Sequence, residues 1–298
     1  MTPVLFSVSY AGYWGQHRLD LPAFLRKAAA LGYPAVELAA KRPHLSPLDH
    51  NDESLMQLRR LADQLGVAIV TIAGYTDWTS GRDAAEVPFV EMQLAYVDSL
   101  ARMGRLLGAK IVRVFSGYSR THHTYQSDWN RCVVALREAA TRVQQHGLIL
   151  GLQNHHDLGV GTAAFEELLD EVDHPNLHAM FDPWAPALHG DDLYKVGRRL
   201  APRMVQTTLA DYVRLPRHVY RPELVNYERQ EPDAIRAVPL GEGFLDLPAF
   251  FAGLRDGGFD RLVAYEMCSP VRGGGSEANL DRVASLSLAR IRQLIGGS

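Results

Sequence analysis

Short apolar runs rich in β-branched residues alternate along the chain with longer segments whose apolar positions recur at helical spacing. This alternation is typical of βαβ units, in which helices connect parallel strands. We count eight strand–helix pairs. The expected strands are residues 4–10, 35–38, 67–72, 110–115, 148–153, 178–181, 204–209 and 262–267.

Several of the predicted helices carry start and stop signals. Asp20 followed by Pro22 is typical of a helix N-terminus, and Thr162 is expected to cap a later helix. Glycine stops helices well, and Gly32 and Gly66 lie where two of them should end. The expected helices are residues 21–31, 55–65, 91–107, 128–146, 163–172, 191–200, 248–253 and 277–294.

The order of these elements predicts an α/β protein built as a single (β/α)8 TIM barrel. The chain has 298 residues, and no Ser- or Pro-rich linker or shift in composition divides it. We therefore expect one domain over residues 1–298. The alternative is an open doubly wound sheet, which needs fewer strands and usually a glycine-rich phosphate turn after the first strand. That turn is absent from the sequence.

The longest stretch without a helical or strand pattern covers residues 212–242 and contains four prolines and several basic residues. Loops of this length in compact domains are usually lids or binding elements. We therefore expect this loop to lie over the active face and to close on the pocket. A solvated insertion is the alternative.

Charge and cysteine content narrow the classes of protein. The chain has 31 Lys and Arg against 34 Asp and Glu, a net charge of −3, which disfavours a nucleic-acid partner. Two cysteines, Cys132 and Cys268, are too few for a disulfide framework. The N-terminus lacks a basic leader pattern, and no apolar run reaches the roughly 18 residues that span a bilayer. We expect a cytoplasmic protein without a membrane partner.

Polar residues gather where the predicted strands end, which is where catalytic groups of such barrels lie. They are Glu37, Arg113, Gln153, Asn154, His155, His156, Asp157, Asp182, Gln206, Thr208, Asp211 and Glu266. Burying the carboxylates of Asp182 and Glu266 beside apolar neighbours is costly without a cation or hydrogen bonds. Two such carboxylates at one end of a barrel suit a hard divalent cation, Mg²⁺ or Mn²⁺.

Seven phrases at these strand ends, in order along almost the whole chain, resemble the xylose-isomerase-like sugar phosphate isomerase/epimerase family. They are Ala-Val-Glu-Leu at 35–38, Ala-Lys-Ile-Val-Arg-Val-Phe-Ser-Gly at 109–117, Leu-Gln-Asn-His at 152–155, His-Pro-Asn-Leu at 174–177 with Phe-Asp-Pro at 181–183, Leu-Ala-Asp at 209–211, Gly-Glu-Gly at 241–243 and Tyr-Glu at 265–266. The resemblance implies a TIM barrel and leaves the substrate open.

The same resemblance implies one divalent metal between a Glu on strand five, an Asp on strand six, a His on strand seven and a Glu on strand eight. Asp182 and Glu266 match this pattern, but Gln153 replaces the strand-five Glu and Thr208 the strand-seven His. Gln206 shares the strand face of Thr208 and is our candidate for the vacant place. The expected ligands are then Gln153, Asp182, Gln206 and Glu266, an all-oxygen set that binds metal more weakly than the family's own.

The replacement of the strand-five Glu also affects the implied proton transfers. An amide is no base at neutral pH, so only Glu266 of the family's two glutamates remains. The candidates for the second acid or base are His155, His156 and Glu37. We favour His155 because it shares the strand parity of Gln153.

The remaining candidates are expected to contact substrate. Glu37 is one, although it could equally pair with Arg113, and Arg113 itself could hold either a carboxylate or a substrate oxygen. Trp184 follows strand six, where aromatic rings often stack on sugars, and Arg214 lies in the long loop.

The leading hypothesis is a divalent-metal-dependent isomerase, epimerase or related lyase that acts on a sugar or polyol-derived keto compound through an enediolate. Its partner is this small molecule, and a homo-oligomer is left open. The alternative is a non-catalytic, metal-free sugar-binding barrel, which the residues at positions 153 and 208 motivate. A DNA-repair enzyme resembling endonuclease IV is disfavoured by the charge and by too few histidines at the strand ends.

Overall fold

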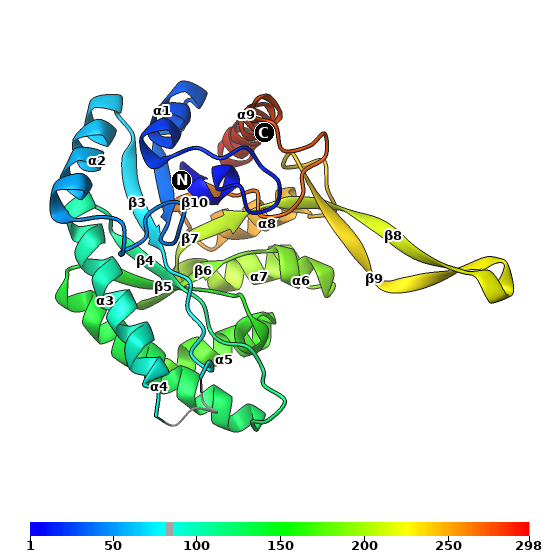
Figure 1. Ribbon diagram of the computed structural model, residues 1–298, viewed down its shortest axis with the longest axis horizontal. Coiled ribbons are helices and arrows are strands. Elements are labelled where there is room, and N and C mark those ends of the chain that lie inside the picture. The colour runs from blue at the N-terminus through cyan, green and yellow to red at the C-terminus, as the bar shows by residue number, and fades with distance from the viewer. Residues whose placement is uncertain (82–85, 298) are drawn as a thin grey trace.

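A computed structural model of the chain describes residues 1–81 and 86–297 and confirms the predicted (β/α)8 barrel (Figure 1). Eight parallel strands close in the order β1-β10-β7-β6-β5-β4-β3-β2. Their bounds are β1 Thr2–Phe6, β2 Ala35–Ala39, β3 Ala68–Ala73, β4 Ile111–Val114, β5 Ile149–Gln153, β6 Leu177–Phe181, β7 Met204–Leu209 and β10 Leu262–Tyr265.

Helices form the outer layer of the barrel. They are α1 Leu21–Leu31, α2 Asp52–Leu65, α3 Phe89–Leu107, α4 Tyr125–Gln145, α5 Thr162–Val172, α6 Trp184–Leu188, α7 Leu193–Leu200, α8 Leu247–Asp256 and α9 Glu277–Gly296. Asp20 caps α1 as predicted, because its Oδ1 accepts from the Ala23 N–H at 2.8 Å. The predicted cap at Thr162 is wrong: Gly161 is the cap residue, and the Thr162 hydroxyl donates to Asp191 at 2.5 Å.

Two elements differ from the sequence pattern near the carboxyl ends of the strands. The first strand ends at Phe6, and residues 7–10 form a 3-10 turn, in which the Ser7 hydroxyl accepts from the Ala39 N–H at 2.9 Å. The short helix α6 was not expected, because Pro186 interrupts the apolar pattern there. Both changes lie beside the strand ends and shape the loops around the barrel mouth.

The barrel interior changes from apolar to polar along its axis. Val4, Ala35 and Ala264 pack together toward the amino end of the strands. Gly151 leaves room for Met180, whose sulfur would lie 2.3 Å from a Cβ at that position. Closer to the carboxyl ends the inward positions are polar, and they include Glu37, Thr71, Arg113, Gln153 and Gln206. The core therefore fills the lower barrel and leaves polar groups for its mouth.

Residues 212–242 form a β-hairpin and not the irregular loop that the sequence suggested. Strands β8 (Asp211–Arg221) and β9 (Asn226–Val238) pair antiparallel and project beyond the barrel (Figure 1). The prolines hid the strand pattern in the sequence, and they are tolerated because they lie where strand pairing is interrupted. Pro216 falls at a register shift, and Pro222 begins the turn. Whether this segment closes over the pocket stays a prediction.

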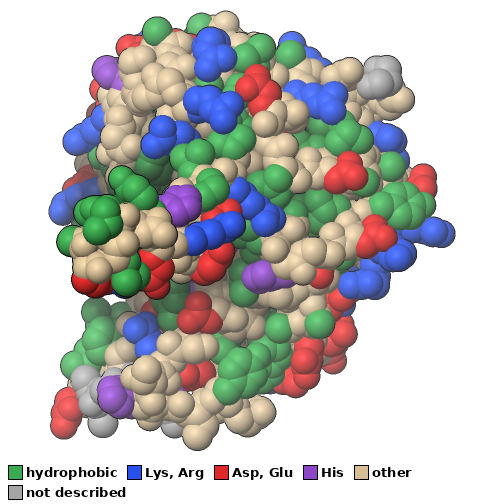
Figure 2. Space-filling view, turned by 90° about the vertical axis from the view of Figure 1, so that its right-hand side faces the viewer, with side chains coloured by type: hydrophobic (Ala, Val, Ile, Leu, Met, Phe, Trp, Pro, Cys, Tyr) green, Lys and Arg blue, Asp and Glu red, His purple; other side chains and the backbone are tan. Residues whose placement is uncertain are grey.

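Figure 2 shows the face from which the hairpin projects, and basic and acidic side chains are interspersed across it. This face therefore shows no continuous patch of side chains of one charge. Within residues 1–81 and 86–297, no helix combines the length and apolarity needed to cross a membrane.

Candidate active site

Asp182 and Glu266 follow β6 and β10 directly and are both buried at the carboxyl end of the barrel. Asn154 fixes the backbone at Asp182: its Oδ1 accepts from the Asp182 N–H at 2.6 Å, and its Nδ2 donates to the Asp182 carbonyl at 2.8 Å. The N–H of Trp184 donates to the Asp182 carboxylate at 2.9 Å. The aspartate is thus held by the loops after two neighbouring strands.

Burial raises the pKa of both carboxyl groups. Burial raises the pKa of Asp182 to about 7, against the opposing effects of the Trp184 N–H, the Gln153 amide and the Arg113 charge. Burial, with the negative charge of Asp182 as the next cause, raises the pKa of Glu266 to about 8. The electrostatic effect of Asp182 on Glu266 supports the expected convergence of these two groups.

Two residues near Glu266 were not identified from the sequence. One of them contacts Glu266, and the other contacts the first. The Cys268 thiol donates to Glu266 Oε1 at 3.3 Å, and the Tyr212 hydroxyl lies 3.1 Å from the Cys268 sulfur. Burial raises the pKa of Cys268 well above its ordinary value, so the thiol stays protonated as a donor. Cys268 is two residues beyond Glu266, and this spacing was the available signal.

Arg113 is the central cation of the mouth and is only 2% exposed. Its Nη1 donates to Gln153 Oε1 at 2.7 Å, and its Nε lies 3.8 Å from Glu37 Oε1. The ring of Phe115 lies 4.1 Å from the guanidinium carbon. The pairing of Glu37 with Arg113 is therefore confirmed, and contact of either with substrate stays a prediction.

Gln206 lies with Glu37 rather than with the carboxylates of Asp182 and Glu266. Its Nε2 donates to Glu37 Oε2 at 2.6 Å, and its Oε1 accepts from the Thr71 hydroxyl at 2.7 Å. Burial raises the pKa of Glu37 to about 7, despite the nearby Arg113 and the Gln206 bond. Both ends of the Gln206 amide are thus engaged by Glu37 and Thr71, and its role as a metal ligand stays a prediction.

Thr208 occupies the place that Gln206 was expected to fill. Met180 is opposite Gln206 in the β6–β7 register, so Asp182 and Thr208 come next on the same inward face. The Thr208 hydroxyl is buried and has no hydrogen-bond partner. A buried orphan of this kind is costly in a folded protein and points to a missing ligand atom.

His155 and His156 form one wall of the mouth together with two aromatic rings. The ring centroids of Phe115 and His155 are 4.4 Å apart, and those of Tyr118 and His156 are 4.0 Å apart. Burial lowers the pKa of His155 to about 3 and that of His156 to about 4, so both imidazoles are neutral at pH 7. His155 is therefore placed near the mouth, and its catalytic role stays a prediction.

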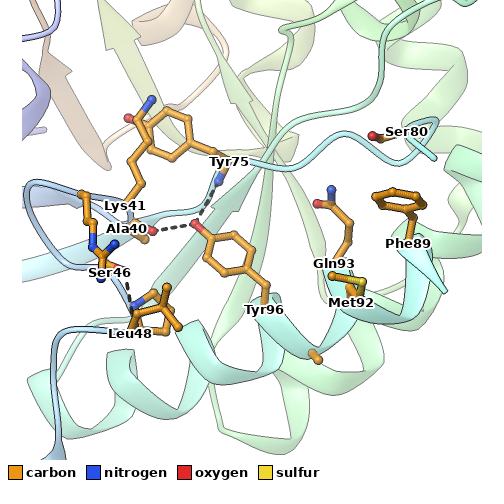
Figure 3. A pocket seen from close by; sticks show the side chains of 13 residues that line it. Ala40, Lys41, Ser46, Leu48, Tyr75, Ser80, Phe89, Met92, Gln93 and Tyr96 are labelled. Atoms are coloured by element: carbon orange, nitrogen blue, oxygen red, sulfur yellow. Dashed lines mark hydrogen bonds between the residues drawn. The ribbon is translucent and has the colours of Figure 1, made fainter. Parts of the chain in front are cut away.

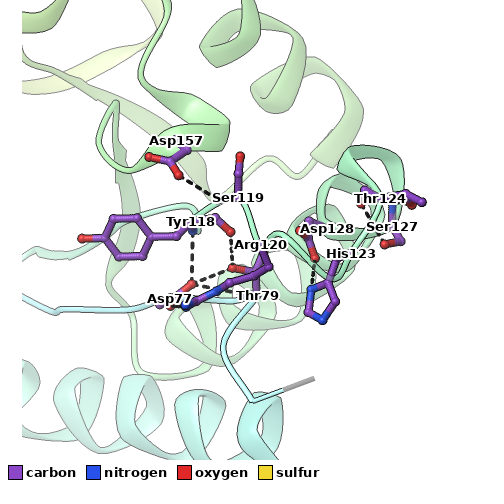
Figure 4. A network of polar contacts seen from close by, with 10 residues as sticks. All are labelled: Asp77, Thr79, Tyr118, Ser119, Arg120, His123, Thr124, Ser127, Asp128 and Asp157. Atoms are coloured by element: carbon purple, nitrogen blue, oxygen red, sulfur yellow. Dashed lines mark hydrogen bonds and ion pairs between the residues drawn. The ribbon is translucent and has the colours of Figure 1, made fainter. Parts of the chain in front are cut away.

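A polar network fixes the loops behind this wall (Figure 4). The Asp77 carboxylate accepts from the Thr79 hydroxyl at 2.8 Å and from the Tyr118 N–H at 3.3 Å, and it pairs with Arg120. Asp157 accepts from the Ser119 N–H at 2.9 Å. These contacts join the loops after β3, β4 and β5, so the position of Tyr118 is set by three strands.

Trp184 and Arg214, the two remaining residues predicted to contact substrate, lie in different parts of the structure. Trp184 begins α6, its ring centroid lies 4.7 Å from that of Tyr212, and its indole N–H is buried without a partner. It therefore lies beside the carboxylates. Arg214 is exposed on β8, with its guanidinium over the Phe244 ring at 4.5 Å, so the structure gives it no contact with the buried groups of the mouth.

The residues present fit a hard divalent cation. Asp182 and Glu266 supply two carboxylates, Thr208 an unpartnered hydroxyl, and Gln153 an amide whose oxygen already accepts from Arg113. Mg²⁺ is commonly held by one or two carboxylates together with substrate oxygens. Among the residues that the structure describes, no group of three or more His, Cys, Asp or Glu side chains is arranged for a metal.

Comparisons with known proteins find relatives of similar sequence or fold. A curated relative, 2-epi-5-epi-valiolone 7-phosphate 2-epimerase of Actinoplanes sp., is 27% identical over 180 residues, which are 60% of this chain and 63% of the relative. The solved structure of D-psicose 3-epimerase with D-tagatose from Clostridium cellulolyticum H10 has a TM-score of 0.75 at 18% identity and covers 99% of both chains.

A second solved structure, the IOLI protein with a binding zinc atom, has a TM-score of 0.76 at 15% identity and covers 99% of this chain and 98% of that one. At these identities both structures show the fold alone. The family model described as the xylose isomerase-like TIM barrel matches residues 25–293, which is most of the chain. With its closed barrel of eight parallel strands, the chain belongs to the xylose isomerase-like TIM barrel family.

Proposed function

We propose that this protein is an isomerase or epimerase, or a related lyase, that moves a proton at the carbon next to the carbonyl group of a sugar or polyol-derived keto compound. The observation that carries this proposal is the buried carboxyl of Glu266, whose pKa of about 8 lies close to neutral pH. A catalytic acid or base works best when its pKa is near the working pH.

In the proposed mechanism the ionised form of Glu266 removes the proton from the substrate carbon, and the carboxyl that results later returns one. The Cys268 thiol orients the carboxylate through its 3.3 Å bond to Oε1. The Arg113–Gln153 pair holds positive charge near Asp182 and Glu266, and Trp184 with the His155 wall orients the sugar. A divalent cation held by Asp182, Glu266 and Thr208 would supply Lewis-acid stabilisation of the negative charge that develops on the substrate oxygens.

The substrate class is supported by what similar proteins are named for. The curated relative is an epimerase of a phosphorylated cyclic polyol ketone, and a structural neighbour is an epimerase that was crystallised with a ketohexose. Both reactions change the configuration at a carbon. We therefore propose a ketose or a cyclic keto-polyol as the substrate of this chain.

Solvent exchange tests the proposal without knowledge of the product. Ketoses and cyclic keto-polyols are incubated with the protein and Mn²⁺ in deuterated water, and loss of the carbon-bound proton is followed by NMR. We expect exchange in at least one compound and a rate lower by about 10² to 10⁴ in Glu266→Gln. Glu167→Gln, which changes an exposed carboxylate on α5, is the control. Equal exchange in Glu266→Gln and wild type would refute the role of Glu266.

One observation favours the alternative of a metal-free binding barrel. Asp182 and Glu266 lack a third acidic or histidine ligand within the described part of the chain. The same experiment distinguishes the two functions. A barrel that binds ketoses but exchanges no proton, with or without Mn²⁺, would be a binding protein.

A further inference from the structure

Lys41 lies at the barrel mouth between two aromatic rings. It lies two residues beyond the end of β2. Its ammonium nitrogen is 3.7 Å from the ring centroid of Tyr75 and 4.4 Å from that of Tyr13. Figure 3 shows the Lys41 and Tyr75 side chains lying side by side and pointing away from α3.

The charge of Lys41 has no acidic partner in residues 1–81 and 86–297. Burial and the positive charge of Arg113 lower its pKa, and no carboxylate opposes them. Two other lysines differ in this respect, since Lys27 pairs with Glu277 and Asp281, and Lys195 pairs with Asp192. A half-buried ammonium without an anion costs free energy in the folded protein.

The backbone around Lys41 is held rigidly. The Tyr96 hydroxyl donates to the Ala40 carbonyl at 2.6 Å and accepts from the Tyr75 N–H at 3.4 Å, as Figure 3 shows. The Tyr13 hydroxyl donates to the Arg42 carbonyl. These bonds join the loops after β1, β2 and β3 to helix α3, so Lys41 needs little ordering when a ligand binds.

An open space and an unused donor accompany this charge. Lys41 and Tyr75 line a cavity of about 860 Å³ that extends to Phe89 and Met92 of α3. The Tyr75 hydroxyl is buried and has no hydrogen-bond partner. The Tyr75 ring also lies 4.9 Å from the Arg113 guanidinium, so Tyr75 adjoins the proposed catalytic groups.

We propose that Lys41 and the Tyr75 hydroxyl form a subsite for a phosphate ester group of the substrate. Lysine binds phosphate as a point charge, and a hydroxyl donates to its oxygens. The subsite rests on the proposed function, because it assigns a phosphorylated member of that substrate class. It explains why an ammonium and an orphan hydroxyl are kept together at the mouth.

Lysine labelling tests this subsite without turnover, using inorganic phosphate as the probe. The four lysines of the chain, Lys27, Lys41, Lys110 and Lys195, are methylated reductively and quantified by mass spectrometry at increasing phosphate concentration. We expect phosphate to protect Lys41 and to leave the exposed Lys110 and Lys195 unaffected. Equal labelling of Lys41 with and without phosphate overturns the proposal, and so does protection by acetate as strong as that by phosphate.

Binding by variants gives a second readout. The dissociation constant for inorganic phosphate, measured by calorimetry, should rise about tenfold or more in Lys41→Met, the loss expected for a hydrogen bond to a charged group. Lys41→Arg should retain most of the affinity, and Lys195→Met should match wild type. Unchanged affinity in Lys41→Met overturns the subsite. Because none of these measurements needs proton exchange, their failure is separate from failure of the proposed function.

Discussion

Replacing Glu266 by Gln should change how the stability of the protein depends on pH. The substitution keeps the shape of the side chain and an acceptor for the Cys268 thiol, but removes the ionisable group. In the wild type, the pKa of Glu266 in the folded chain is about 8 against an ordinary value of 4.5. The folded state therefore holds a proton that the unfolded state has lost between these pH values.

The sign and size of the effect follow from this difference. Stability contributed by the protonated carboxyl is complete below pH 4.5 and is lost as the pH rises through 8. A pKa difference of about 3.5, at about 1.4 kcal/mol per pKa unit, corresponds to about 5 kcal/mol, which is lost between pH 4.5 and pH 8. The Gln variant does not incur this loss, so it should equal wild type near pH 5 and be more stable by up to about 5 kcal/mol at pH 9.

Urea unfolding followed by the fluorescence of the four tryptophans measures the free energy of unfolding at each pH. Glu167→Gln controls for the loss of a carboxylate elsewhere. Adding Mn²⁺ at pH 9 should stabilise the wild type more than Glu266→Gln, which has lost one of the proposed ligands. A gap between the two proteins that stays the same from pH 5 to pH 9 would show that Glu266 is not buried beside Asp182 as described.

Three further changes probe other parts of the structure. Arg113→Met should lower the free energy of unfolding by about 3–5 kcal/mol, because it leaves Glu37 buried without its cation, and the added change Glu37→Gln should restore part of it; urea unfolding at pH 8 that shows no loss would contradict this. Thr208→His should tighten Mn²⁺ binding in equilibrium dialysis about tenfold, because imidazole is a stronger ligand than a hydroxyl, whereas unchanged affinity would place Thr208 away from the ion. Replacing residues 216–235 by a Gly-Gly turn should leave the barrel folded, with a melting temperature within about 4 °C of wild type by circular dichroism, because these residues project from it; loss of the folded barrel would show that the hairpin supports it.

The barrel was predictable because each strand and helix carries its own local pattern. Asp20 and Gly32 mark the ends of α1 in sequence as in structure, and strand β7 has the predicted bounds. The hairpin was not predictable in this way. Pro216 and Pro222 interrupt the alternation of β8 and β9, although the pairing resumes around them.

The sequence predicted which residues belong to the candidate site better than it predicted their level along the barrel axis. Strand parity correctly turned Gln206 and Thr208 inward, but it cannot say which of them lies level with Asp182, because that depends on the register of β6 against β7. Parity also fails for residues beyond a strand end: the extended backbone stops at Gln153, so the placement of His155 depends on the stacking of its ring on Phe115.

Lys41 shows the opposite case, in which the sequence held a signal that went unused. Lys41 lies two residues beyond the end of β2, and a polar residue just after a strand was the signal that identified the other strand-end residues. What sequence could not show is the pair of aromatic rings around it. Tyr13 and Tyr75 come from the loops after two other strands, and only the closed barrel brings them together.

A crystal structure of the protein soaked with Mn²⁺ and measured by anomalous scattering tests the central claim most directly. We expect one strong peak at the carboxyl end of the barrel, within ligand distance of the carboxylates of Asp182 and Glu266, with the Thr208 hydroxyl facing it. A map without such a peak, in which both carboxylates turn to Arg113, would contradict the claim that these two groups form the reaction centre.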